Sequence, residues 1–159
     1  MTPDYLLTNS IDPALALLER LSGLVPNAQA RVLVLAIAGQ ESGWVARRQI
    51  GGPARSFWQF EKGGGVAGLF NVARIRLQAL CSELAVPFND TDVFEAMAWN
   101  DTLAAGMARL LLWSDPAPLP NVGDVNGSWA YYERNWRPGA PHPEVWPARY
   151  ATAMGLVKP

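Results

Sequence analysis

Glu41 is the residue whose type and position most clearly suit it to chemistry. It follows an apolar stretch, residues 32–38, at the point where that stretch should leave the protein core. Burial disfavours the charged form of a carboxyl group, so we expect the pKa of Glu41 to be raised. A carboxylic acid that keeps its proton near neutral pH can protonate a leaving oxygen. The competing interpretation is a glutamate that only marks the solvated end of a helix.

A second carboxylate, Glu61, is the only other one between residues 42 and 82. Glycoside hydrolysis commonly uses two carboxyl groups, one as the acid and one as the nucleophile or as the base for a water molecule. A chain that turns back after Glu41 would place the two carboxyl groups across a groove. The alternative is that Glu61 begins the next helix or pairs with Lys62 at the surface.

Aromatic residues are abundant, with seven tryptophans and four tyrosines in 159 residues. Sugar rings present flat apolar faces, and the indole of tryptophan offers a matching surface with a polar N–H group. Trp58 lies beside Gln59 and is a candidate for either a sugar-binding cleft or the core. Trp99 and Trp113 lie at helical spacing among apolar residues, which predicts that both belong to the core.

Charge is nearly balanced, with a net charge of -1, but residues 42–76 hold six basic side chains against one carboxylate. A locally basic face can attract an acidic ligand, and the plainer interpretation is a solvated rim. A protein held on nucleic acid by bulk charge would be more basic, so we expect no strong binding to DNA. The basic residues are Arg47, Arg48, Arg55, Lys62, Arg74 and Arg76.

Several classes of site and location are disfavoured by the sequence. Cys81 is the only cysteine and His142 the only histidine, so we expect neither an internal disulfide nor a multi-histidine metal site, and no cofactor. Residues 32–38 form the longest apolar run and are too short to cross a bilayer. No basic segment followed by an apolar stretch opens the chain, which predicts synthesis in a reducing compartment without a signal peptide. Residues 63–68 match G-x-G-x-x-G, but no βαβ unit surrounds them, so we expect a flexible loop.

The elements that must position these residues are mostly helices. Residues 32–38 are apolar all round, which predicts a helix buried on every side, capped by Asn27 and ending near Ser42; a strand is the competing assignment. Residues 43–68 are rich in glycine and predict a loop with a small β-hairpin around residues 56–60. Further helices are expected from Asp12–Pro13 to about residue 23, and over residues 72–84, 92–113, 124–136 and 143–156. With no repeat and no long linker, residues 1–159 are expected to form one mainly α domain.

Two segments together resemble a known family. Gln40-Glu41-Ser42-Gly43-Trp44, followed by the glycine-rich and aromatic residues 51–61, is similar to the lysozyme-like superfamily, specifically to lytic transglycosylases and phage endolysins. In that family a Glu-Ser pair ends a buried helix, and a glutamine on a short hairpin follows. Residues 129–150, which are rich in tryptophan and tyrosine, also resemble the C-terminal helices of phage-encoded members. The resemblance implies a lysozyme-like fold over roughly residues 30–155.

The resemblance also implies roles for individual residues. Glu41 resembles the general acid of the family, and Gln59 resembles the glutamine that lines the glycan cleft. Tyr132 resembles the tyrosine near the acid, although the adjacent Tyr131 is an alternative. The two serines are candidates for hydrogen bonds to a substrate acetamido group or to Glu41, against a role in capping. The expected substrate-binding residues are therefore Ser42, Ser56, Trp58, Gln59, Tyr131 and Tyr132.

The activity that the resemblance implies is cleavage of the MurNAc–GlcNAc β-1,4 bond of peptidoglycan by a monomer without a cofactor. Two departures from the family pattern, Phe57-Trp58 before Gln59 and Glu133 after Tyr132, leave open whether the product is an anhydro sugar or a hydrolysed one. Release by a holin or packaging in a virion would bring such a protein to the cell wall. Alternatives are a weakly active glycan-binding or phage structural module, a chitinase-like enzyme that uses Glu41 and Glu61, and a nucleic-acid-associated helical protein.

Overall fold

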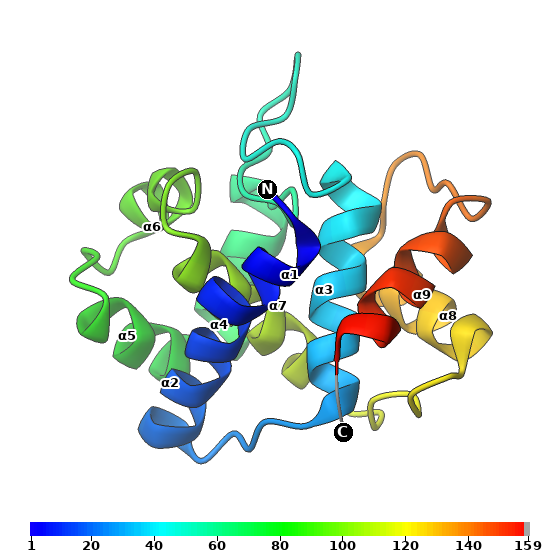
Figure 1. The fold of residues 1–159 in the computed structure, drawn as a ribbon. Coiled ribbons are helices and arrows are strands. Elements are labelled where there is room, and N and C mark those ends of the chain that lie inside the picture. Colours follow the sequence, from blue (N-terminus) through cyan, green and yellow to red (C-terminus); the bar gives the residue numbers. More distant parts are fainter. Residues whose placement is uncertain (158–159) are drawn as a thin grey trace.

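The protein is mainly helical, and its helices surround one buried central helix, α3 (Ala28–Ser42) (Figure 1). A computed structural model describes residues 1–157. The side chain of Asn27 accepts a hydrogen bond from the backbone N–H of Ala30 at 2.7 Å and begins the helix as predicted. Every residue from 32 to 39 is buried, because α7 (Asp101–Ser114), α8 (Val125–Trp136), α9 (Trp146–Leu156) and the N-terminal helices pack around α3. The expected buried helix is confirmed, and the strand alternative is wrong.

The N-terminal part of the chain is one continuous helical segment. It comprises α1 (Pro3–Leu6), a π-helical stretch η1 (Leu7–Ile11) and α2 (Asp12–Ser22). The expected start of a helix at Asp12–Pro13 is wrong, because helix already precedes these residues. Its carboxylate instead accepts hydrogen bonds at 2.8 Å from the guanidinium of Arg31, which ties α2 to α3. The end of α2 at Gly23, where φ is 68°, agrees with the expected boundary.

The long helix expected over residues 92–113 is two helices, α6 (Asp90–Ala96) and α7 (Asp101–Ser114). Asn89 and Asn100 each cap one of them, so the break follows from a second capping residue inside the apolar pattern. Trp99 lies in the turn between them with 68% of its surface exposed, and its assignment to the core is wrong. Trp113 is partly buried against the core. The remaining helices are α4 (Ala67–Val72), α5 (Arg74–Glu83), α8 (Val125–Trp136) and α9 (Trp146–Leu156).

Residues 43–61 form a loop that projects beside the carboxyl end of α3 (Figure 1). Two isolated antiparallel bridges, Arg48 with Arg55 and Arg55 with Phe60, hold it together. No regular strand forms among residues 1–157, so the expected turn-back of the chain is present without a regular hairpin. The glycine run that was expected to be a flexible loop is a π-helical turn, η2 (Lys62–Val66), which continues directly into α4.

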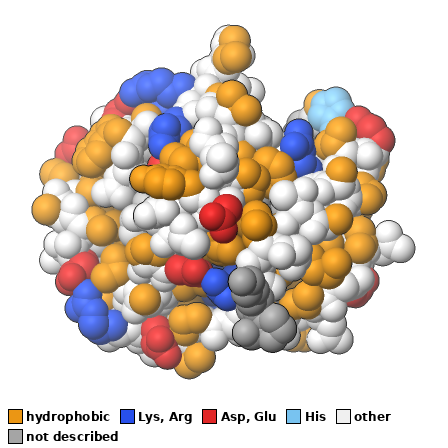
Figure 2. Space-filling model, viewed as in Figure 1, with side chains coloured by type: hydrophobic (Ala, Val, Ile, Leu, Met, Phe, Trp, Pro, Cys, Tyr) orange, Lys and Arg blue, Asp and Glu red, His pale blue; other side chains and the backbone are white. Residues whose placement is uncertain are grey.

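The basic segment is largely neutralised by acidic residues of α6 and α7. Figure 2 shows blue and red side chains side by side at the base of the projecting loop. Arg48 and Arg55 both contact the Glu95 carboxylate, at 3.5 and 3.4 Å. The other ion pairs are Arg47 with Asp101 and Lys62 with Asp90. Because each of these cations has a nearby carboxylate, the expected basic face has much less free positive charge than the sequence implies.

No helix within residues 1–157 combines the length and the apolar composition that crossing a bilayer would require.

The carboxyl end of α3 is held by a packing contact with Trp44. The indole of Trp44 folds back over the helix, and its N–H donates to the Leu35 carbonyl at 3.0 Å. Gly39 makes this approach possible, because a Cβ atom at that position would clash with the indole ring.

We therefore predict that Gly39→Ala lowers the free energy of unfolding by about 1–3 kcal/mol, the usual cost of forcing an extra methyl group into a packed core. Gly155→Ala on α9 is the matched control, because a Cβ atom there meets no neighbour within 4 Å. Alanine at that helical site should stabilise the protein by up to about 1 kcal/mol. Urea unfolding of the three proteins measures both effects. Equal stability of the two variants would contradict the packing argument.

Candidate active site

The carboxyl group of Glu41 lies at the end of α3, half-buried, and contacts Tyr132 of α8. The Tyr132 hydroxyl donates a hydrogen bond to Oε1 of Glu41 at 2.6 Å, the short distance typical of a bond to an ionised acceptor. α3 ends just beyond Glu41, where Gly43 adopts the left-handed conformation with φ 60°. The helix therefore stops as it leaves the core, and Glu41 lies at that boundary as predicted.

Burial raises the pKa of Glu41 from 4.5 to about 7, and the hydrogen bond from Tyr132 lowers it in part. The pKa of the Tyr132 hydroxyl is also raised, first by its own burial and then by the neighbouring carboxylate. Tyr132 therefore keeps its proton and acts as a donor. A carboxyl group with a pKa near 7 can both donate and accept a proton at neutral pH, which is the property that general acid–base catalysis requires.

Tyr132 is held in place by aromatic side chains of α8 and α9. Its ring stacks on that of Trp146, with centroids 5.3 Å apart and planes 12° from parallel. Trp129 packs against both rings, and the indole N–H of Trp146 donates to the Val125 carbonyl at 3.1 Å. These contacts leave the Tyr132 side chain little freedom, so its hydroxyl stays aimed at Glu41.

Glu41 and Tyr132 face a cleft of about 1310 Å³. One wall comes from the end of α3, the projecting loop and η2 with α4; the other comes from the end of α7, from α8 and from the loop that follows α8. Among the predicted site residues, Glu41, Gln59, Glu61 and Tyr132 line this cleft. The second carboxylate thus shares a cavity with the first, and its side chain is exposed to solvent.

Gln59 is fixed by the backbone of the projecting loop. Its side-chain amide donates to the Ser56 carbonyl at 2.7 Å, and the residue adopts a left-handed conformation with φ 50°. Residues other than glycine, asparagine and aspartate rarely adopt this conformation. The loop therefore presents this side chain to the cleft in one defined orientation.

The two serines that were expected to bind substrate make structural hydrogen bonds instead. The Ser42 hydroxyl donates to the carbonyl of Ala38 at 2.9 Å, within the last turn of α3. Ser56 is fully buried, and its hydroxyl accepts a hydrogen bond from the backbone N–H of Trp58 at 3.2 Å. Neither serine lines the cleft. Each hydroxyl group pairs with a backbone group, Ser42 in the last turn of α3 and Ser56 in the projecting loop.

Two of the predicted aromatic contacts also belong to the core. Trp58 is fully buried, and its indole N–H donates to the Val34 carbonyl of α3 at 2.7 Å. Tyr131 points away from Glu41, since its hydroxyl donates to the Leu112 carbonyl at 2.8 Å. The choice between the adjacent tyrosines therefore falls on Tyr132, and Trp136 is the tryptophan that lines the cleft.

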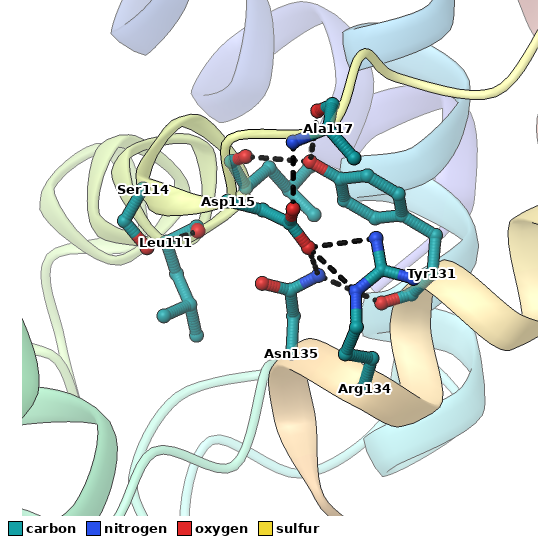
Figure 3. Close-up of polar contacts among 8 residues, drawn as sticks. Leu111, Ser114, Asp115, Ala117, Tyr131, Arg134 and Asn135 are labelled. Carbon is teal, nitrogen blue, oxygen red and sulfur yellow. Dashed lines mark hydrogen bonds and ion pairs between the residues drawn. The ribbon is translucent and has the colours of Figure 1, made fainter.

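The sequence analysis missed Asp115, which joins the end of α7 to α8 at the cleft wall (Figure 3). Its carboxylate accepts hydrogen bonds from the Ala117 backbone N–H, from the Arg134 guanidinium and from the Asn135 amide, each at 2.8–2.9 Å. Burial acts to raise the pKa of Asp115, but these donors together lower it below its usual value. The one sequence signal was the Ser114-Asp115-Pro116 helix end, which does not identify partners about 20 residues away.

No protein-family model matches the chain, and no curated protein or solved structure matches it either. The resemblance to lytic transglycosylases and endolysins therefore stays a prediction. Within residues 1–157, no three His, Cys, Asp or Glu side chains gather closely enough to hold a metal ion. The chemistry that the cleft can support is that of Glu41, with Tyr132 as its partner and Glu61 nearby.

The raised pKa of Glu41 predicts a specific pH dependence of stability. Glu41 binds its proton more tightly in the native state than in the unfolded chain, so its stabilising effect is complete below pH 4.5 and is lost as the pH rises to about 7. Glu41→Gln removes this loss, so its free energy of unfolding should equal that of wild type at pH 4. At pH 8 the free energy of unfolding of the variant should exceed that of wild type by up to about 3 kcal/mol. Denaturant unfolding at a series of pH values measures this difference, and parallel stability curves would contradict it.

Proposed function

We propose that this protein is a glycanase that cleaves the MurNAc–GlcNAc β-1,4 bond of peptidoglycan, with Glu41 as the general acid and then as the base. The observation that carries the proposal is the half-buried Glu41 carboxyl group, whose pKa is about 7 and which faces a large cleft beside Tyr132. The motif around Glu41 and the aromatic Gln59 segment support the same class of enzyme.

In the proposed first step, protonated Glu41 donates its proton to the glycosidic oxygen while the bond from that oxygen to the anomeric carbon breaks. The hydrogen bond from Tyr132 stabilises the carboxylate that remains. The positive charge that develops on the sugar ring is offset by this carboxylate. The ionised Glu41 can then remove a proton in the second step.

Two second steps are compatible with the cleft. In a lytic transglycosylase the substrate's own acetamido group takes the part of the nucleophile, and Glu41 then deprotonates the sugar 6-hydroxyl to form an anhydro product. In a hydrolase Glu61 activates a water molecule that attacks the anomeric carbon. Glu61 lines the same cleft and is solvent-exposed, which favours contact with water. The dependence of the reaction on Glu61 separates the two routes.

The size and lining of the cleft support a polymeric sugar as substrate. Its volume of about 1310 Å³ exceeds the roughly 300–1,000 Å³ of typical small-molecule pockets. Trp136 lines it with its indole N–H already bound to the Trp58 carbonyl at 3.0 Å. This arrangement fixes the ring for stacking against a sugar face.

One cation in the cleft favours peptidoglycan over chitin. Arg137 ends α8 in a left-handed conformation with φ 49° and lines the cleft. No carboxylate in the described part of the chain pairs with it. The stem peptides of peptidoglycan carry carboxylates, whereas chitin carries none. The proposed place of action is therefore the bacterial cell wall, reached by holin-dependent release or within a virion.

Digestion of purified peptidoglycan by wild type, Glu41→Gln and Glu61→Gln tests the proposal. Glu41→Gln should lower the rate by about 10²–10⁴-fold, the usual contribution of a general acid. Mass spectrometry of the products identifies the route. If the products are anhydro sugars and Glu61→Gln is active, the reaction is transglycosylation. If the products incorporate labelled water and Glu61→Gln is inactive, the reaction is hydrolysis.

Three results would contradict the proposed function. Equal activity of wild type and Glu41→Gln would exclude Glu41 as the acid. Binding to peptidoglycan without any cleavage by wild type would indicate the weakly active glycan-binding module. Cleavage of chitin in preference to peptidoglycan would indicate the chitinase-like alternative.

Tyr132→Phe tests the electrostatic role of the tyrosine. The hydrogen bond from Tyr132 lowers the pKa of Glu41, so its removal should raise that pKa above 7. Because the general acid must be protonated, activity should fall off at a higher pH in the variant than in wild type, with a lower maximal rate. A pH–rate profile measures this shift. Tyr131→Phe is the control, since its hydroxyl binds the Leu112 carbonyl, and it should leave the profile unchanged.

A further inference from the structure

A second depression lies outside the cleft, between the N-terminal helix and the turn that precedes α7. Its volume is about 330 Å³, near the lower end of ligand-binding pockets. Two aromatic side chains line it and are largely exposed, Tyr5 at 53% and Trp99 at 68%. An indole exposed to this degree contributes little to stability by burial, and together with Tyr5 it leaves aromatic surface open to a ligand.

The charged side chains of this depression cancel each other. The Arg47 guanidinium donates two hydrogen bonds to the Asp101 carboxylate, each at 2.8 Å, in the planar bidentate arrangement. The Asp101 side chain is only 12% exposed, so the pair is part of the wall of the depression and is not a free charge. A charged ligand would therefore gain little here.

Two asparagine side chains leave polar groups for a ligand. Asn9 uses its amide N–H groups on the Tyr5 carbonyl and on Thr8, and its Oδ1 accepts no hydrogen bond from any described residue. Asn100 uses its Oδ1 as the cap of α7, and its Nδ2 has no acceptor among residues 1–157. The two asparagines thus leave one free acceptor and one free donor among the residues that line the depression.

We propose that this depression is a second carbohydrate-binding site, which takes a neutral, N-acetylated segment of a glycan. Exposed aromatic rings stack on the apolar faces of sugars, and neutral amides pair with their hydroxyl and acetamido groups. The identity of the polymer rests on the proposed function, whereas the aromatic and amide chemistry of the site does not.

The projecting loop borders both sites. Arg47 of this loop lines the depression, while Gln49 and Gln59 line the cleft. A glycan strand held at Trp99 would therefore keep the protein on a polymeric wall while Glu41 acts on another segment. The second site should matter for insoluble polymer and not for short soluble fragments.

Site-specific NMR tests the proposal directly. Chitotetraose is titrated into ¹⁵N-labelled Glu41→Gln, and the indole N–H signal of Trp99 is assigned from its loss in Glu41→Gln/Trp99→Ala. The Trp99 indole and the Asn100 side-chain amide should shift with saturation. Shifts at Trp136 alone would overturn the second site and leave the cleft proposal intact. Shifts at Trp99 with no digestion of peptidoglycan by wild type would overturn the proposed function and support the second site.

Binding to insoluble peptidoglycan provides a second readout. Trp99→Ala should weaken co-sedimentation by about 2- to 12-fold, which corresponds to the 0.5–1.5 kcal/mol of an aromatic contact. Cleavage of short soluble fragments should not change. Ile75→Ala is the matched control, because Ile75 is 84% exposed on α5 and lines neither site. A loss of self-association in Trp99→Ala, measured by light scattering, with unchanged co-sedimentation would show an interface between copies and overturn the proposal.

Discussion

The hydrogen bond between Tyr132 and Glu41 is the interaction on which the candidate site depends. It joins the end of a helix with no solvent-facing side to a tyrosine 91 positions later in the chain. Burial of the carboxyl group moves its pKa upward and the tyrosine moves it downward, so the balance near 7 requires both contacts. A fully solvated Glu41 would be ionised at neutral pH, and a fully buried one without a donor would stay protonated. The packing of α3 and the docking of α8 therefore set the chemistry together.

Two different kinds of contact hold α8 in place for this purpose. Stacking of Tyr132 on Trp146 fixes α8 against α9, and the Asp115 carboxylate ties α8 to the end of α7 through Arg134 and Asn135. Apolar packing restricts translation but tolerates small rotations, whereas the two hydrogen bonds from α8 to one carboxylate fix direction as well. The combination explains how a hydroxyl group on an otherwise buried ring can be placed at 2.6 Å from a specific oxygen.

The sequence was sufficient for features that depend on local patterns. The apolar stretch before Glu41 and the capping residue Asn27 identified α3 and its functional end, because both signals act within one helix. Solvent exposure of single aromatic residues was not predictable in the same way. Trp58 is buried because the projecting loop folds back on α3. Trp99 is exposed because it lies in the turn between α6 and α7, where Asn100 caps a new helix. The burial of Trp58 depends on a contact between distant segments, which spacing alone does not encode, whereas the exposure of Trp99 depends on a local cap that the continuous apolar pattern obscured.

The ion pairs of the projecting loop also determine what kind of ligand each side of it can recognise. Arg47, Arg48 and Arg55 are engaged by carboxylates of α6 and α7, so they position the loop and contribute little long-range attraction. Recognition must then come from short-range stacking and neutral hydrogen bonds, with Arg137 as a cation at one edge of the cleft. Such contacts discriminate by shape and hydroxyl pattern more than by charge. The proposed substrate, a neutral sugar backbone bearing occasional carboxylates, would fit this distribution of groups better than a nucleic acid, whose charge repeats at every phosphate.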